Sequence, residues 1–292
     1  MYNNHGQHNV LRLALPKGRM FDEIQRLLND ANVRVSQSER DYRPTISLPD
    51  TTVKILKPRN VIGMLLAGAR DIGFAGADWI DETDADLVQL LDTGFNPVRL
   101  VAAAPIEILV EDQLPDQELL IATEYPEITR RWIERKKLSA RVLTTFGATE
   151  VFPPEDADMI VDNTATGSTL RANGLQIVDE LMTSTTRLFA SHAAMDCKIK
   201  RERIEALVML LQSVLEARKR VMLDLNVELA QLNSVIEALP CLRQPTISQL
   251  NEEGWFAVRA AVPRNELNTL IPLLKTRGAS GIVVTRPEQI IP

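Results

Sequence analysis

The sequence has few of the residues that carry redox and metal chemistry. Its 292 residues include only two cysteines, Cys197 and Cys241, whose spacing fits neither a metal site nor a disulfide framework, so we expect packing residues in a reducing compartment. No stretch approaches the roughly 18 consecutive apolar residues of a membrane-spanning helix. The first ten residues are polar and lack the apolar core of a secretory signal. These absences predict a soluble, cytoplasmic protein with no membrane partner.

A surplus of positive charge is also missing. The chain has 33 basic and 39 acidic residues, a net charge of −6, which argues against nucleic acid as the main partner because phosphate backbones select basic faces. Hydrophobic residues at 45% and charged residues at 25% are ordinary for a globular protein, and the length suffices for two or three domains. A local anion site remains compatible with this composition.

The stretch 157–175, ADMIVDNTATGSTLRANGL, joins a strand pattern to a loop rich in hydroxyl groups. Residues 158–162 are predicted to form a buried strand with a carboxylate at each end. Residues 164–169 then surround one glycine with hydroxyls, and residues 170–173 begin a helix. The order of strand, loop and helix is typical of an anion-binding loop.

The atoms of this loop suit a phosphorylated ribose. Successive backbone N–H groups and the partial positive charge of a helix N-terminus favour a phosphate. Asp162, just before the loop, lies about a ribose length away, where a carboxylate can accept hydrogen bonds from two vicinal hydroxyls. A ribose 5-phosphate therefore fits Asp162 and the loop at 166–169.

A plainer reading is that Asp162 caps a turn and the Thr and Ser residues cap a helix, as such side chains often do. A TGST segment by itself favours that reading. The acid pair of Asp158 and Asp162 favours substrate binding instead.

With Gly174 and Leu175 included, the stretch resembles the phosphoribosyl-diphosphate loop of the ATP phosphoribosyltransferase family, which catalyses the first step of histidine biosynthesis. The family pattern is an acid, three apolar residues, Asp, three residues, Thr-Gly-x-Thr-Leu and Ala-Asn-Gly-Leu, and this chain keeps every element. Further segments that resemble the family are LRLALPKGRM at 11–20, AGARDIGFAGAD at 67–78, ATEYPEITR at 122–130 and LPCLRQPTI at 239–247.

The apolar pattern predicts an α/β fold with two lobes and a further domain. Strand, loop and helix alternate from Val10 to Ala104, and the pattern restarts at Leu119. Residues 201–220 form an amphipathic helix, for which core packing is favoured over a partner-helix surface. Residues 220–292 read βαββαβ, a ferredoxin-like order. The resemblance implies a two-lobed, periplasmic-binding-protein-like catalytic core and the regulatory domain of long-form enzymes. The expected boundaries are 1–104 and 187–219 for lobe I, 105–186 for lobe II and 220–292 for the regulatory domain.

Two further loops at predicted strand ends carry cations. From spacing alone, Lys17 and Arg19 are as compatible with a solvated surface pair as with a ligand site. The resemblance implies that their loop holds nucleotide and diphosphate. Where the family usually has Arg-Pro-x-Asp-Val-Pro, this chain has Lys-Pro-Arg-Asn-Val-Ile from Lys57, so a point charge replaces a planar guanidinium. Either Lys57 or Arg59 is expected to serve the leaving diphosphate.

The resemblance implies roles for single residues. The expected catalytic residues are Asp162, Arg19 and Lys57. The expected residues that bind phosphoribosyl diphosphate are Asp158, Thr166, Gly167, Ser168 and Thr169. The expected nucleotide-binding residues are Lys17, Gly18, Asp78, Glu124 and Tyr125, although the residue pattern alone favours a core position for Tyr125. The expected histidine-binding residues of the regulatory domain are Asn226, Leu242, Thr246 and Gly281. Asn226 stands where relatives carry an aspartate, so histidine binding is expected to be weak.

The reaction implied is attack by N1 of ATP on the ribose of 5-phosphoribosyl 1-diphosphate, giving N1-(5-phosphoribosyl)-ATP and diphosphate. We expect catalysis by positioning and charge neutralisation rather than by a histidine base, because His5 and His8 lie in a polar tail and His192 lies outside every motif. Mg²⁺ is expected to arrive with the diphosphate, without a protein cage. The chain is expected to form a homo-oligomer, a dimer or hexamer.

Two other functions remain open from the sequence. Another phosphoribosyltransferase shares such a loop, but the KGRM and ATEYP segments then lack an explanation. A bilobed binding or sensor protein without catalysis is the second alternative, because fold does not determine function.

Overall fold

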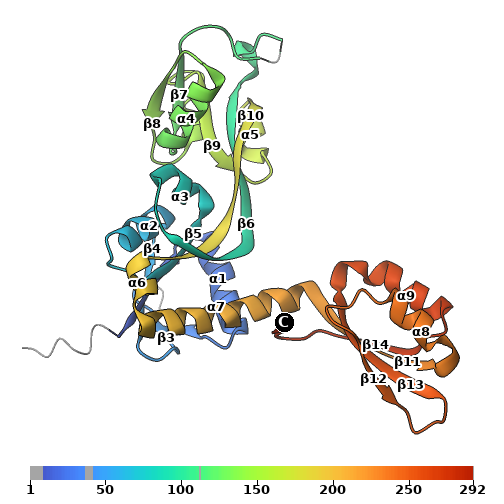
Figure 1. Cartoon of the computed structure of the whole chain (residues 1–292). Coiled ribbons are helices and arrows are strands. Elements are labelled where there is room, and N and C mark those ends of the chain that lie inside the picture. Colours follow the sequence, from blue (N-terminus) through green and yellow to red (C-terminus); the bar gives the residue numbers. More distant parts are fainter. Residues whose placement is uncertain (1–8, 37–41, 112, 292) are drawn as a thin grey trace, which may run out of the picture. The chain divides into compact units, whose positions relative to one another are not determined.

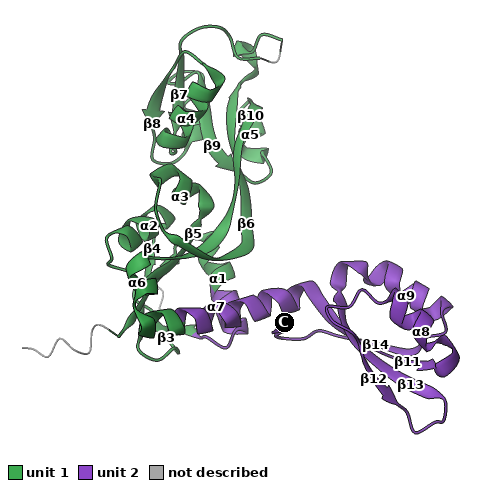
Figure 2. Cartoon of the chain, viewed as in Figure 1, with its two compact units in different colours: residues 1–24, 35–203 green, residues 25–34, 204–292 purple. Residues whose placement is uncertain are grey.

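Figure 1 shows the computed structural model, which describes residues 9–36, 42–111 and 113–291. The chain forms two compact units, one within 1–24 and 35–203 and the other from 25–34 and 204–292 (Figure 2). Among the described residues, no helix combines the length and the apolar character needed to cross a bilayer.

An eight-stranded mixed sheet, in the order β4-β1-β5-β10-β6-β9-β7-β8, runs through the first unit. Its strands are β1 (Leu11–Pro16), β4 (Thr51–Leu56), β5 (Ile72–Gly76), β6 (Val88–Pro105), β7 (Leu119–Thr123), β8 (Ala140–Thr144), β9 (Met159–Thr164) and β10 (Leu175–Ala190). A separate small sheet pairs β2 (Val35–Ser36) with β3 (Thr45–Ile46).

The sheet divides into two parallel halves joined by two long antiparallel strands. Strands β4, β1 and β5 are parallel and form lobe I, whereas β9, β7 and β8 are parallel and form lobe II. Strands β6 and β10 run side by side from one lobe to the other (Figure 1). The two-lobed α/β core predicted from the sequence is therefore confirmed.

Helices cover both lobes. Their bounds are α1 (Arg19–Asp30), α2 (Pro58–Leu66), α3 (Ala77–Thr83), α4 (Pro126–Lys136), α5 (Ser168–Ala172), α6 (His192–Asp196) and α7 (Lys198–Lys219), with 3₁₀ turns η1 (Ile106–Ile108) and η2 (Thr149–Val151). Both α2 and α4 begin with proline, which has no N–H to lose at a first helical position. Helix α3 was not predicted, because its seven residues are too few to show a helical period.

Apolar residues at 87–91 and at 98–104 indicate two separate strands in the sequence, but β6 is one strand that continues through both. The pairing of β6 with β10 shifts register repeatedly in this region, and Asn96 has a φ of 46°. Residues that signal a turn, Gly94 and Asn96, are accommodated as irregularities within one strand. The consequence is an unbroken connection between the lobes.

The second unit contains the predicted ferredoxin-like domain. Its elements are β11 (Arg220–Glu228), α8 (Leu229–Ala238), β12 (Thr246–Gln249), β13 (Trp255–Pro263), the turn η3 (Arg264–Glu266), α9 (Leu267–Thr276) and β14 (Ser280–Thr285). The antiparallel order β12-β13-β11-β14 leaves Val221, Leu223 and Leu225 of β11 buried on one face. This unit also includes residues 25–34 and the part of α7 from Ile204. The apolar face of α7, at Leu207, Leu211 and Val214, is buried, as expected for a helix that packs in the core.

Candidate functional site

Strands β9, β7 and β8 end at the same edge of lobe II, which is where open α/β sheets bind ligands. Asp162 lies near the end of β9, Glu124 directly follows β7, and Thr149 belongs to the turn after β8. The structure thus brings Asp162 and Glu124, predicted as ligands of ribose and nucleotide, to one edge of the sheet.

Asp162 is half-buried among negative neighbours. Loss of hydration raises the pKa of its carboxyl to about 6, and the charges of Glu124 and Glu150 act in the same direction. Hydrogen bonds from the backbone N–H of Asn163, at 2.7 Å, and from the Thr149 hydroxyl oppose this rise. A carboxyl that titrates this close to neutrality is a candidate functional group.

The predicted phosphate loop turns at Gly167, whose φ of 73° lies in the left-handed region that favours glycine. The backbone N–H of Gly167 donates a 2.9 Å hydrogen bond to Oγ1 of buried Thr164. The Thr166 hydroxyl donates to the Ser168 hydroxyl at 3.0 Å, and Ser168 and Thr169 are exposed. Exposed hydroxyls and the first N–H groups of α5 are therefore available to an anion.

Arg171 belongs to this loop but was missed by sequence reasoning. Its Nη2 donates to the carbonyl oxygen of Thr166 at 3.2 Å. Its Nη1 lies 3.0 Å from the position that a Cβ on Gly167 would take. The guanidinium adds positive charge beside the loop, and the basic residue within TLRANG was the available signal.

Asp158 does not join this site. It precedes β9, at the opposite end of the strand from the loop, and its Oδ2 accepts a 2.6 Å hydrogen bond from the backbone N–H of Leu120. At roughly 3.3 Å per strand residue, Asp158 and Asp162 are about 13 Å apart along β9. The structure places Asp158 away from the loop, where its carboxylate holds β9 against β7, and its contact with phosphoribosyl diphosphate stays a prediction.

The two cationic loops of lobe I lie next to each other. Strands β1 and β4 are parallel neighbours, and the backbone N–H of Lys17 donates to the carbonyl oxygen of Leu56 at 2.7 Å. Lys17, Gly18 and Arg19 are exposed, and Gly18 has a φ of 84°. The loop therefore presents its two cations at the carboxyl edge of lobe I.

Tyr42 was not predicted to contribute to this edge. Nζ of Lys17 donates to the Tyr42 hydroxyl at 3.1 Å and lies 5.2 Å from the centre of its ring. The ring is 54% exposed, so it can cover a bound base while it orients Lys17.

Lys57 and Arg59 have different surroundings. Lys57 is exposed just before α2, whereas the Arg59 guanidinium lies 5.7 Å from the centre of the Trp79 ring. Arg59 also borders a hollow of about 340 Å³ beside α2, together with Leu56 and Thr83. Because Arg59 is engaged by an aromatic face, Lys57 is the freer of the two to reach a diphosphate.

Asp78 and Tyr125 are buried and satisfied inside the protein. Asp78 is 5% exposed in α3, and Tyr125 is 1% exposed within the core of lobe II. The Tyr125 hydroxyl donates to Oδ2 of Asp78 at 2.8 Å. The nucleotide contacts of both residues stay predictions, and the core position of Tyr125 that the residue pattern favours is confirmed.

Glu82 joins the lobes at the same place. Its carboxylate is 4% exposed and accepts hydrogen bonds of 3.0 to 3.1 Å from the backbone N–H groups of Glu127 and Ile128 in the first turn of α4. Burial raises the pKa of this carboxyl, although these N–H groups oppose the rise. Sequence reasoning missed Glu82, because it lies in the short helix that showed no period.

Three of the four residues predicted to bind histidine lie on or beside one face of the second unit's sheet. Thr246 is paired with Arg259 in the strand register, and Arg259 in turn with Asp224 of β11. Asn226 lies two residues further along β11, so its side chain points to the same face. A Cβ on Gly281 would lie 3.1 Å from Nδ2 of Asn226. Leu242 instead meets this sheet through its backbone N–H, which donates to Ala261 at 3.1 Å.

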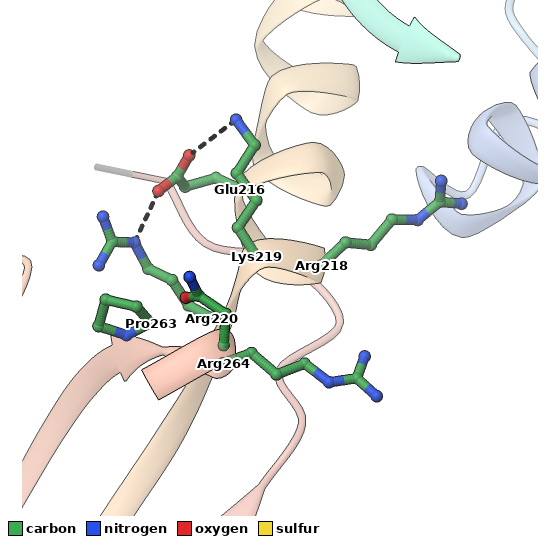
Figure 3. Close-up of a pocket in the computed structure, with 7 residues that line it drawn as sticks. Glu216, Arg218, Lys219, Arg220, Pro263 and Arg264 are labelled. Atoms are coloured by element: carbon green, nitrogen blue, oxygen red, sulfur yellow. Dashed lines mark hydrogen bonds and ion pairs between the residues drawn. The ribbon is translucent and has the colours of Figure 1, made fainter. Parts of the chain in front are cut away.

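The second unit also contains a hollow of about 640 Å³ where α7 passes into β11. Figure 3 shows Glu216 between Lys219 and Arg220, its carboxylate 3.8 Å and 2.6 Å from their side-chain nitrogens. Arg218 is paired with Asp30 at 2.7 Å. These two carboxylates balance part of the positive charge of the lining, and no predicted site residue lines the hollow.

Metal binding has no preformed cage in the described part of the chain. Within it, no three His, Cys, Asp or Glu side chains gather closely enough to hold an ion.

Comparisons with known proteins cover nearly the whole chain. Residues 57–213 match the family described as ATP phosphoribosyltransferase, and residues 217–288 match the family described as HisG, C-terminal domain. The ATP phosphoribosyltransferase of Chlorobaculum parvum is 40% identical over 280 residues, which cover 94% of this chain and 95% of the relative. That of Chlorobium phaeobacteroides is 39% identical over 279 residues, with the same coverage.

A solved structure agrees with these relatives. A chain of the ATP phosphoribosyl transferase (HisG:HisZ) complex from Thermotoga maritima is similar with a TM-score of 0.63 and 31% identity, covering 71% of this chain and 99% of that one. The present chain also has a C-terminal domain with its own family match. The chain belongs to the ATP phosphoribosyltransferase family, in the long form that carries a C-terminal domain.

Proposed function

We propose that this chain transfers the 5-phosphoribosyl group from 5-phosphoribosyl 1-diphosphate to N1 of ATP, releasing diphosphate, as the first step of histidine biosynthesis. The observation that carries the proposal is the position of Asp162 directly before the Thr166–Thr169 loop at the carboxyl edge of lobe II. A carboxylate for two hydroxyls and a loop for a phosphate are the two contacts that a ribose 5-phosphate requires.

The chemistry assigned to the protein is positioning and charge stabilisation. The lone pair of adenine N1 attacks C1 of the ribose while the bond from C1 to the diphosphate breaks, so positive charge develops on the sugar. The Asp162 carboxylate holds the ribose hydroxyls and counters that charge, while Lys57 and Arg19 receive the negative charge of the leaving diphosphate. A separate base is unnecessary because N1 carries no proton to remove.

Mg²⁺ is part of this proposal as a partner of the diphosphate. When bound, it neutralises charge on the leaving group and keeps much of its water. Asp162 and Glu124 offer carboxylate oxygens at the carboxyl edge of lobe II, which can accept hydrogen bonds from such water molecules. The protein's own contribution is to orient the sugar between this edge and the cations of lobe I.

Feedback inhibition by histidine belongs to the proposal as well. Asn226 and Thr246 on one sheet face, with Gly281 beside Asn226, offer an amide, a hydroxyl and an open backbone position to an amino acid. We expect inhibition to be weak, transmitted through rearranged contacts between subunits of a cytoplasmic homo-oligomer rather than by competition for ATP.

The test is turnover of ATP and 5-phosphoribosyl 1-diphosphate by the purified full chain, followed by diphosphate release and by mass measurement of the nucleotide product. Turnover with ATP but not with free purine or pyrimidine bases supports the proposal over other phosphoribosyltransferases. Binding of both substrates without diphosphate release identifies a sensor instead. Repeating the assay with histidine tests the regulatory part separately.

A further inference from the structure

One buried hydroxyl bridges the two lobes. Tyr125, at the start of α4 in lobe II, donates to Oδ2 of Asp78 in α3 at 2.8 Å and accepts from Nδ2 of Asn163 at 2.9 Å. Asp78 directly follows β5 of lobe I, whereas Asn163 lies in β9 of lobe II. The phenol thus uses its donor and its acceptor for different lobes.

At the lobe I end of this bridge, the Asp78 carboxylate is held in one orientation by Ser184. The Ser184 hydroxyl, in β10, donates to Oδ1 of Asp78 at 2.6 Å and accepts from the backbone N–H of Asp78 at 3.1 Å. Ser184 is 3% exposed. Both carboxylate oxygens of Asp78 are therefore occupied, and a buried network with every group satisfied is rigid.

The lobe II end of the bridge reaches the carboxylate of Asp162, the residue proposed to hold the ribose. The side chain of Asn163 is held by Tyr125, and its backbone N–H donates to Oδ1 of Asp162 at 2.7 Å. Fixing the Asn163 side chain restrains the peptide that joins it to Asp162, and this restrains the direction of the carboxylate. The position of Asp162 thereby depends on a contact made across the lobes.

An aromatic pair adds a second connection at the same place. The rings of Trp79 and Tyr125 stack with centroids 4.7 Å apart, and the Arg59 guanidinium lies over Trp79. Arg59 follows Lys57 by two residues, so this pair connects the segment of Lys57 in lobe I to Tyr125 in lobe II. Separation of the lobes would disturb both ends together.

We propose that Tyr125 is a positioning residue for phosphoribosyl transfer: through Asn163 it holds the Asp162 carboxylate in place, and it does so only while Asp78 keeps the lobes in contact. This inference rests on the proposed transferase function. It gives Tyr125 a task that needs no contact with the nucleotide, and it makes assembly of the ribose site conditional on the lobes being together.

The test is Tyr125→Phe, which keeps the ring and removes the bridging hydroxyl. We expect kcat/KM for 5-phosphoribosyl 1-diphosphate to fall roughly tenfold or more, as for a lost positioning hydrogen bond, with little change in KM for ATP. We also expect the acid limb of the pH profile to move to higher pH, because a loosened Asn163 N–H favours ionised Asp162 less.

The matched control is Asp179→Asn, which weakens two contacts with α4 without touching the Asp78 bridge. These contacts are a 2.8 Å hydrogen bond from the indole N–H of Trp132 and a 2.8 Å ion pair with Lys136. This control should lower the melting temperature and leave both kinetic readouts unchanged. Tyr125→Phe kinetics and pH dependence equal to those of the control would overturn the inference.

Two further measurements keep the inference testable in all cases. If Tyr125→Phe does not fold, Asn163→Ala at an exposed position replaces it and should give the same kinetic pattern. If the unmodified protein shows no turnover, the proposed function fails, and calorimetric binding of 5-phosphoribosyl 1-diphosphate decides instead. Weaker binding by Tyr125→Phe than by Asp179→Asn supports the inference, and equal binding rejects it.

Discussion

The carboxylate of Asp158 accepts a 2.6 Å hydrogen bond from the backbone N–H of Leu120, and the N–H of Asp158 donates to the carbonyl oxygen of Leu120 at 2.9 Å. This reciprocal contact joins the start of β9 to β7. It separates the roles of two carboxylates that the sequence presents as a pair, because Asp162 lies at the other end of β9.

Asp158→Ala should therefore affect stability rather than substrate binding. Loss of a hydrogen bond to a charged group is expected to lower the free energy of unfolding by about 1–3 kcal/mol. Denaturant unfolding and steady-state kinetics measure the two effects separately. A fall in kcat/KM with unchanged stability would show instead that Asp158 belongs to the substrate site.

Asp162→Asn should impair the reaction but should not lower the stability of the fold. The folded-state pKa of about 6 exceeds the ordinary value of 3.8, so the folded state binds more protons than the unfolded state between those values. The contribution of Asp162 to stability therefore falls as pH rises through this window, and above pH 6 its ionised form destabilises the fold. We expect the variant to be more stable by roughly 1–3 kcal/mol at pH 8, with no advantage below pH 4.

The same titration predicts the pH dependence of activity. Only ionised Asp162 offers all its lone pairs to the ribose hydroxyls, so kcat/KM for 5-phosphoribosyl 1-diphosphate should fall as pH drops through about 6. The acid limb should disappear in Asp162→Asn, whose activity is uniformly low. An unchanged limb in that variant would assign the limb to another group.

Gly167→Ala should weaken substrate binding more than its matched control, Gly174→Ala. Gly167 and Gly174 have φ angles of 73° and 71°, so an alanine at either costs roughly 1 kcal/mol in backbone strain. Only at Gly167 does a new Cβ approach another group, Nη1 of Arg171 at 3.0 Å; Gly174 has nothing within 4 Å. Equal KM values for 5-phosphoribosyl 1-diphosphate in the two variants would argue against the phosphate loop. Thr169→Ala, which removes an exposed hydroxyl, should raise this KM without a stability cost.

Lys57→Ala should lower kcat/KM by roughly tenfold to a hundredfold, because it removes a donor for the leaving diphosphate. Lys57→Arg restores the planar fork usual in the family and should equal or exceed the unmodified protein. The control is Lys54→Ala, three residues earlier on β4. If Lys57→Ala retains full activity while Arg59→Ala loses it, Arg59 is the diphosphate ligand.

Asn226→Asp should strengthen histidine binding, by roughly tenfold, because a carboxylate pairs with the ligand's ammonium group where the amide offers a neutral acceptor. Calorimetric titration of both proteins with histidine measures this. Gly281→Ala should weaken binding, since its Cβ would lie 3.1 Å from Nδ2 of Asn226. Tighter binding by the unmodified protein than by Asn226→Asp would remove position 226 from the site.

The features that could be read from the sequence are those that depend on neighbouring residues. The alternation of apolar runs predicts most strands and helices of both units, because burial of one face repeats with the period of the element. The phosphate loop is recognisable for the same reason: Gly167 supplies a left-handed turn, and the hydroxyls and N–H groups that follow it are consecutive in the chain. Family resemblance reaches the same residues through those local patterns.

The tertiary structure decided what depends on partners distant in the chain. Asp158 and Asp162 look alike in sequence. Only the pairing of β9 with β7 brings the Asp158 carboxylate to the backbone N–H of Leu120. Tyr125 lies within a family motif, yet the Asp78 carboxylate, 47 residues away, holds its hydroxyl in the core. The raised pKa of Asp162 comes from burial and from charges on other loops. A carboxylate's hydration and electrostatic surroundings are set by every element packed around it, and no local spacing carries that information.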